Sequence, residues 1–214
     1  MAAHRLTSET IDTEAALRAL IGEPAEIVCA KVTDRLNALT RRYIELSPFV
    51  CLATSDARGT CDVSPRGDPR GFVRILDDRT LLLPERPGNK LADSLRNILA
   101  NPHIGMLFVI PGVTDTFRVN GRATIVTSVS LLAPCIVEGK TPKLGILVDI
   151  ESAYTQCSKA FLRSHFWDPE RFVNRDEVLP TNGEIHRAIA GDDFDAAKYD
   201  EERAARYAKR EGFY

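Results

Sequence analysis

Residues 49–83 read FVCLATSDARGTCDVSPRGDPRGFVRILDDRTLLL, and this stretch decides the fold class. Its apolar runs are short, and they are separated by clusters of Ser, Asp, Pro and Gly that favour turns. Runs of this length and composition are typical of strands, here over residues 49–54, 61–64, 72–76 and 80–83. Because the connections are too short to contain crossover helices, the pattern predicts an antiparallel barrel or meander rather than βαβ units.

One amphipathic helix and further strands follow this stretch. Residues 89–100 place their apolar side chains on one helical face, with Asn89 as the expected N-cap. Residues 114–127 alternate between apolar and polar side chains, which favours one continuous strand, although Asn120-Gly121 would also suit a hairpin turn. The other strands are predicted over residues 104–110 and 144–154.

The sequence divides into a central β domain and two helical extensions, predicted as residues 1–47, 48–167 and 168–214. In the first extension, Ser8 and Thr10 are candidate N-caps, and residues 25–46 have the periodicity of a single helical run. In the last, residues 192–210 are expected to form a charged helix with its acids early and its bases late, as the helix dipole prefers.

Composition excludes several classes of function. The 28 basic and 30 acidic residues give a net charge of −2, without the basic surface that nucleic-acid binding requires. No apolar run is long enough to cross a membrane, and the N-terminal residues lack the apolar core of a secretory signal. The 5 cysteines are scattered, and neither they nor the 4 histidines have metal-ligand spacing. The sequence therefore predicts a cytoplasmic protein with reduced thiols and no metal site.

The segment Pro84-Glu85-Arg86-Pro87-Gly88-Asn89-Lys90 is the strongest candidate for a binding site. It connects a predicted strand to the start of the predicted helix, where free backbone N–H groups together with Arg86 and Lys90 would hold a phosphate. The alternative is an ordinary connecting loop with solvated charges.

Two further sets of cations are candidates. Arg66, between Pro65 and Gly67, would reach an anion with its guanidinium, or would pair with Asp68 in a surface turn. The polar face of the long predicted strand carries Arg118, which points either to solvent or to a ligand.

The motifs DVSPRGDP, RPGNK, SLRNIL and RVNGRA, in this order, resemble the pyridoxamine 5′-phosphate oxidase-like, FMN-binding split-barrel proteins. The resemblance is greatest to a bacterial subgroup of uncharacterised flavoproteins and covers most of residues 10–170. It implies a mainly β protein with flanking helices, built on a six-stranded antiparallel split β-barrel. It also implies a homodimer with one FMN in each of two clefts between the subunits.

The resemblance assigns roles to individual residues. Lys90 matches the lysine that binds the FMN phosphate, and Asn89 stands where the true oxidases usually have arginine, so Arg86 is expected to support Lys90. Ser64 and Arg66 match the strand that follows the ribityl chain and the flavin edge, and Arg66 or Arg118 would stabilise the reduced flavin. The residues expected to reach the site from the partner subunit are Lys159, Arg163 and Trp167.

The expected function is that of an FMN-dependent oxidoreductase whose substrate the sequence does not identify. SPRGDPRGFV stands where the true oxidases have an RxVLLK-type strand, and their C-terminal pyridoxal phosphate-binding segment has no counterpart in the charged tail. One alternative is a deazaflavin or a haem on the same barrel, although His103 is the only histidine of the barrel strands that would serve as a haem ligand. The other is a non-catalytic FMN carrier or sensor.

Overall fold

The computed structural model describes residues 10–214, so the candidate cap Ser8 lies outside the described residues. The chain divides into two compact units, with the boundary between Val32 and Thr33 in the sequence. In the first unit, Thr13 caps helix α1 (Glu14–Ile21) by accepting a hydrogen bond from the backbone N–H of Ala16, at 3.2 Å. The predicted cap at Thr10 is therefore wrong. The helices of this unit are α1 (Glu14–Ile21) and α2 (Glu26–Ala30).

The helical run predicted over residues 25–46 is interrupted. Helix α2 ends at Ala30, and Thr33 then pairs with Ala153 as an isolated β-bridge. The next helix, α3 (Ala38–Leu46), begins at Asn37, whose side chain accepts hydrogen bonds from two backbone N–H groups in a capping box. The prediction of one helix was wrong because periodicity does not report a backbone pairing between residues so far apart in the sequence.

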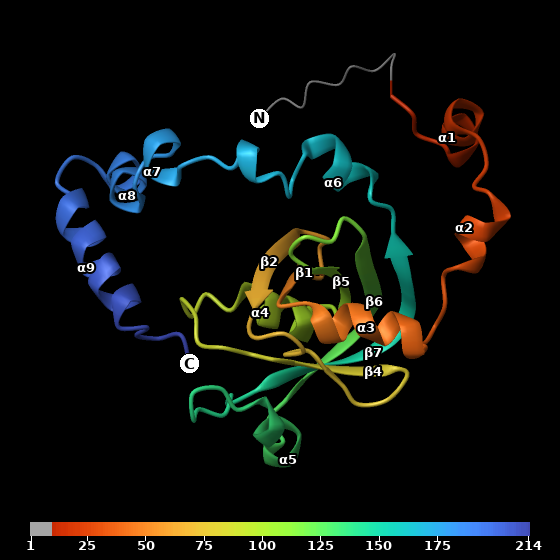
Figure 1. Ribbon diagram of the computed structural model, residues 1–214, viewed down its shortest axis with the longest axis horizontal. Helices are drawn as coiled ribbons and strands as arrows, with labels where there is room; N and C mark the ends of the chain where they lie inside the picture. Colours follow the sequence, from red (N-terminus) through yellow and green to blue (C-terminus); the bar gives the residue numbers. More distant parts are fainter. Residues whose placement is uncertain (1–9) are drawn as a thin grey trace. The chain divides into compact units, whose positions relative to one another are not determined.

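The second unit is organised around one antiparallel sheet of seven strands, in the order β2-β1-β5-β6-β7-β4-β3 (Figure 1). The prediction of a mainly β protein with flanking helices and an antiparallel split barrel is confirmed. The sheet differs from the six-stranded expectation in its extra short strand, and β2 and β3 are not paired to close it. The strands are β1 (Phe49–Ser55), β2 (Cys61–Gly67), β3 (Arg74–Ile75), β4 (Thr80–Pro84), β5 (His103–Val109), β6 (Thr116–Val126) and β7 (Gly145–Gln156).

Strand β6 is continuous through Asn120-Gly121, so the hairpin alternative is excluded. On its apolar face Phe117, Val119, Gly121 and Ala123 are buried, whereas on the other face Arg118 and Asn120 are half-buried and Arg122 and Thr124 are exposed. The register with β7 shifts between Asn120 and Gly121, where a bulge brings the two backbones close together. The core is built from the inward faces of the strands, and its fully buried members include Val50, Leu52, Leu81, Leu83, Met106, Phe108, Phe117, Val119, Ile146 and Val148.

The remaining helices follow or connect the strands. No helix of the described residues is long and apolar enough to cross a membrane. The charged helix predicted over residues 192–210 is confirmed, but the helix before it was not predicted. The helices that follow or connect the strands are α4 (Asp93–Ala100), α5 (Val129–Leu132), α6 (Lys159–Ser164), α7 (Arg175–Val178), α8 (Asn182–Ala190) and α9 (Ala196–Ala208). Single turns of 3₁₀-helix lie at Ala133–Cys135 and Pro169–Arg171.

Helices α8 and α9 meet at Gly183, and the contact is expected to weaken in acid. Asp200 accepts the backbone N–H of Gly183 at 2.9 Å. The hydroxyl of Thr181, and then this N–H, lower the pKa of the Asp200 carboxyl. A lowered folded-state pKa stabilises the contact above the unfolded pKa of about 4, and the stabilisation is lost as the pH falls through the folded value.

The Gly183 amide resonance should therefore shift in an NMR titration from pH 6 to pH 2.5, with a midpoint below about 4. Asp200→Asn should remove this transition. A Gly183 resonance that follows the same titration in both proteins would contradict the assignment.

Candidate functional site

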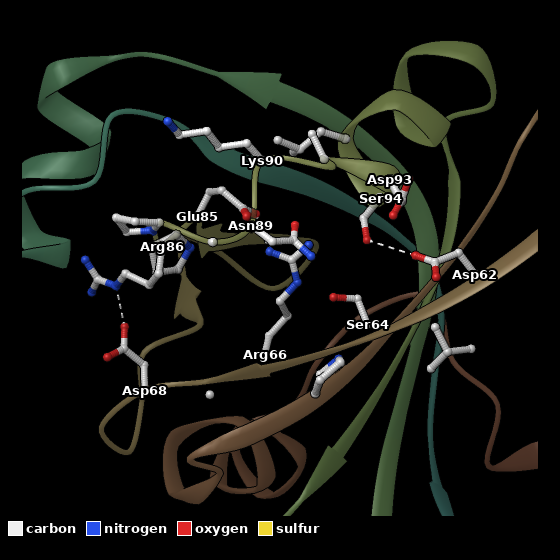
Figure 2. A pocket seen from close by; sticks show the side chains of 18 of the residues that line it. Asp62, Ser64, Arg66, Asp68, Glu85, Arg86, Asn89, Lys90, Asp93 and Ser94 are labelled. Carbon is white, nitrogen blue, oxygen red and sulfur yellow. Dashed lines mark hydrogen bonds and ion pairs between the residues drawn. The ribbon is translucent and has the colours of Figure 1, made fainter. Parts of the chain in front are cut away.

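A cavity of about 580 Å³ lies between strand β2, the segment that follows β4 and the first turn of α4 (Figure 2). Pockets of this volume are typical of small-molecule and cofactor sites. The cavity brings together residues from two separate predicted segments. Those of the predicted site residues that line it are Ser64, Arg66, Arg86, Asn89 and Lys90.

Strand β2 supplies one wall of the cavity. The sequence predicts a loop from Pro65, but the strand continues to Gly67 and pairs with β1 along its whole length. Pro65 is tolerated because β2 is an edge strand, where the missing N–H leaves no ladder bond unmade. Strand alternation then directs Ser64 and Arg66 to the same face, where both are half-buried.

Arg66 makes an ion pair with Glu85, on the segment that follows β4. Both side chains are largely buried, with 17% and 18% of their surface exposed. The Nε atom of Arg66 is buried and has no hydrogen-bond partner among the described residues. An unsatisfied buried donor is costly, so this N–H is a position where a ligand acceptor atom would be stabilised.

Arg86 lines the cavity from the segment that follows β4, and two hydrogen bonds hold its guanidinium. Its Nε donates to Asp68 at 2.6 Å, and its Nη2 donates to the carbonyl of Cys135 at 2.8 Å. The two segments are thus joined by crossed ion pairs, Arg66 with Glu85 and Arg86 with Asp68, and the Arg66–Asp68 pair considered from the sequence is not formed. The Arg86 guanidinium thus bonds to Asp68 and Cys135. Its expected support of Lys90 stays a prediction.

The loop before α4 differs from its prediction. Helix α4 begins at Asp93, and Asn89 accepts the backbone N–H of Leu91 instead of capping a helix. Lys90 and Ala92 both have positive φ angles, 66° and 56°, which are uncommon for residues other than glycine. Backbone strain of this kind is concentrated at ligand sites, and here it places Lys90 at the edge of the cavity.

Lys90 is exposed and makes no ion pair within residues 10–214. Beside it, the first turn of α4 lines the cavity, and no side chain caps its backbone N–H groups. The expected combination of a lysine and a helix start is therefore present, displaced to Asp93. Two carboxylates share this end of the cavity, Asp93 and also Asp62, which accepts the hydroxyl of Ser94 at 3.3 Å.

The other predicted site residues do not line this cavity. Arg118 donates to the hydroxyl of Tyr154 at 3.0 Å, across β6 and β7. Trp167 donates to the carbonyl of Val113 at 2.9 Å and stacks on Phe161. The remaining two, Lys159 and Arg163, belong to α6. Their roles toward a partner subunit stay predictions.

Sequence reasoning assigned no role in the site to Glu85 or to Tyr214. Glu85 precedes Arg86 directly and carried a signal, because a carboxylate next to a predicted phosphate site needs a cation of its own. Tyr214 carried none: its hydroxyl donates to Asp68 at 2.8 Å across 146 residues of sequence. Burial raises the pKa of the Tyr214 hydroxyl, and so does this hydrogen bond.

Comparison with known proteins gives a family match and similar structures. The family model described as pyridoxamine 5′-phosphate oxidase matches residues 36–157, which is more than half of the chain. The match contains all seven strands of the sheet and the whole cavity. No curated protein matches the chain.

Among the similar solved structures is HupZ from Group A Streptococcus, with 21% sequence identity and a TM-score of 0.46 over 56% of this chain and 93% of that one. An FMN-binding protein from Syntrophomonas wolfei has 12% identity and a TM-score of 0.41 over 56% and 89% of the two chains. HutZ, the haem storage protein from Vibrio cholerae, has 14% identity and a TM-score of 0.39 over 57% and 94%.

Proposed function

The chain belongs to the pyridoxamine 5′-phosphate oxidase family, and from this we propose that it binds FMN in the cavity described above and acts as a flavin-dependent oxidoreductase. Proteins of this family typically bind flavin. The observation that carries the proposal is the convergence of Ser64, Arg66 and Lys90 on one cavity, with a buried Arg66 N–H that lacks a partner among the described residues.

The residues present fit FMN in size and in chemistry. A cavity of about 580 Å³ lies within the range of cofactor sites. FMN presents acceptors along its whole length, in the phosphate, the ribityl hydroxyls and the ring carbonyls. The cavity offers donors in the same variety, with an ammonium at Lys90, a hydroxyl at Ser64 and a guanidinium N–H at Arg66.

Each donor has a distinct role in the proposal. Lys90 binds the phosphate together with the uncapped N–H groups of α4, because Lys90 precedes the first residue of the helix by three positions and both line the cavity. Ser64 and Arg66 orient the ribityl chain and the ring, since β2 directs both side chains to the same face. Bound FMN would supply hydride acceptance and electron transfer to an acceptor.

The site is completed in the proposal by a second copy of the chain. Lys159, Arg163 and Trp167 then approach the FMN from the partner subunit, together with the polar face of β6 that carries Arg118. Light scattering should report a dimer, and Trp167 fluorescence should respond to FMN only in that dimer. A monomer that binds FMN with unchanged Trp167 fluorescence would contradict this arrangement.

Lys90→Ala is expected to weaken FMN binding by roughly 1.5–3 kcal/mol, about 10- to 150-fold in Kd, the scale of a hydrogen bond to a charged group. Isothermal titration with FMN measures the change, and the variant should keep the circular dichroism spectrum of the parent. Lys143→Ala is the matched control, because Lys143 is exposed and lies outside the cavity. Equal FMN affinity in the two variants would remove Lys90 from the phosphate site.

Parallel titrations separate FMN from the alternatives. Deazaflavin and haem have absorbance spectra that differ from that of FMN, so one spectrophotometric series with each compound identifies the preferred ligand. Reduction of the bound flavin by NADH or NADPH under argon, followed by reoxidation with oxygen or a quinone, then distinguishes an oxidoreductase from a non-catalytic carrier. A carrier would retain FMN without turnover.

A further inference from the structure

The last residues of the chain contact the wall of the cavity from outside. Tyr214 does not line the cavity, but its hydroxyl donates to Oδ1 of Asp68 at 2.8 Å. Its ring also lies under the guanidinium of Arg86, 5.1 Å from the ring centroid, within the range of a cation–π contact. Asp68 and Arg86 both line the cavity, so Tyr214 is one residue removed from any ligand there.

Residues 210–214, named the strap here, have their own anchors on the turn at residues 138–140. Arg210 makes an ion pair with Glu138 at 2.7 Å, and Lys140 donates to the main-chain oxygen of Tyr214 at 3.1 Å. The Arg210 guanidinium also lies 5.8 Å from the centre of the Tyr214 ring. The position of Tyr214 is therefore fixed by contacts that do not involve the cavity.

The strap completes the hydrogen bonding of a buried carboxylate that is already paired with Arg86. Oδ2 of Asp68 accepts from Arg86, Oδ1 accepts from Tyr214, and the side chain is only 1% exposed. A bare carboxylate in the wall of the cavity would repel a phosphate, because charges interact over several ångströms in a partly buried site. With both oxygens bonded, the negative charge of Asp68 is spread over two donors and shielded from the cavity.

We propose that the strap masks Asp68, and that Tyr214 thereby acts as a positioning residue that sets the affinity of the cavity for a phosphorylated ligand. The inference rests on the proposed function in taking FMN as that ligand. Masking of Asp68 differs from a general stabilising role of the strap, because it changes the binding of a negatively charged ligand and not that of an uncharged one. The strap should therefore favour FMN over riboflavin, which lacks the phosphate.

The experiment compares FMN and riboflavin binding by the full chain and two variants. Tyr214→Phe keeps the ring over Arg86 and removes only the hydroxyl, and Arg210→Gln loosens the strap at Glu138 without touching Asp68. Both should raise the Kd for FMN about three- to tenfold and leave the Kd for riboflavin unchanged. Arg206→Gln, on the exposed surface of α9, is the control and should change neither.

Three outcomes would overturn the proposal. Equal weakening of FMN and riboflavin would show that the strap is merely structural. An unchanged FMN affinity would show that Asp68 needs no masking, and a tighter FMN affinity would show that the strap competes with the ligand.

The failure of the proposed function is recognised separately. If the parent chain binds neither flavin, FMN is the wrong cofactor, and inorganic phosphate becomes the probe, followed through the NMR signal of Arg86 Nε. Tyr214→Phe must then weaken phosphate binding by a similar factor. Equal phosphate affinity in parent and variant would contradict the masking of Asp68.

Discussion

Gly121→Ala is expected to destabilise the protein by about 3 kcal/mol or more, near or beyond the upper end of the usual cost of overpacking. A Cβ at this position would lie 2.1 Å from the carbonyl oxygen of Asp149 and 3.3 Å from the Cα of Ile150. These are backbone atoms of β7, so no side-chain rotation relieves the contact. The bulge between β6 and β7 would have to open, and with it the longest pairing of the sheet.

Urea denaturation measures this change as a lower unfolding midpoint. Gly88→Ala is the matched control, because a Cβ there meets nothing within 4 Å and its φ lies outside the left-handed region. The control should unfold with the parent. Equal unfolding midpoints for the two variants would contradict the prediction, because they would mean that β6 and β7 accommodate a Cβ at residue 121 without loss of stability.

Asp68→Ala is expected to cost about 3 kcal/mol, the lower end of the range for breaking a buried ion pair from one side. The side chains of Asp68 and Arg86 are 1% and 15% exposed, so removal of the carboxylate leaves a largely buried guanidinium without its counter-ion. The lower end applies because Arg86 borders the cavity and keeps its hydrogen bond to the carbonyl of Cys135.

A double-mutant cycle with Arg86→Ala isolates the pair. The double variant should be less destabilised than the sum of the two single variants, because each single change leaves the other charge unpaired. Glu45→Ala provides a control at the exposed Arg42–Glu45 pair, where 67% and 52% of the two side chains are accessible, and should cost at most about 0.5 kcal/mol. Additive costs in the cycle would show that Asp68 and Arg86 do not depend on each other.

The strands were predictable because their signal is local. The alternation along β6 and the short apolar runs of β1 and β4 are set by side-chain periodicity, which the sequence displays directly. The face of β2 that carries Ser64 and Arg66 follows from the same periodicity, but the strand was ended too early at Pro65. A proline at a sheet edge is permitted, and the sequence does not show which strand is the edge.

The errors concern contacts between distant residues. Thr33 interrupts a helical pattern because it pairs with Ala153, and Arg86 bonds to Asp68 and Cys135 rather than facing the cavity alone. The start of α4 was placed at Asn89 because its side chain has the chemistry of a helix cap, but the hydrogen bond it makes closes a turn before the helix. Local chemistry was identified correctly there, and its position was wrong by one helical turn.

Binding of FMN in this cavity is decided by one measurement, a fluorescence titration of FMN with the purified protein. We expect a change in flavin fluorescence that saturates at one FMN per chain, together with a weaker response in Lys90→Ala. A colourless protein that leaves FMN fluorescence unchanged at every concentration would contradict it.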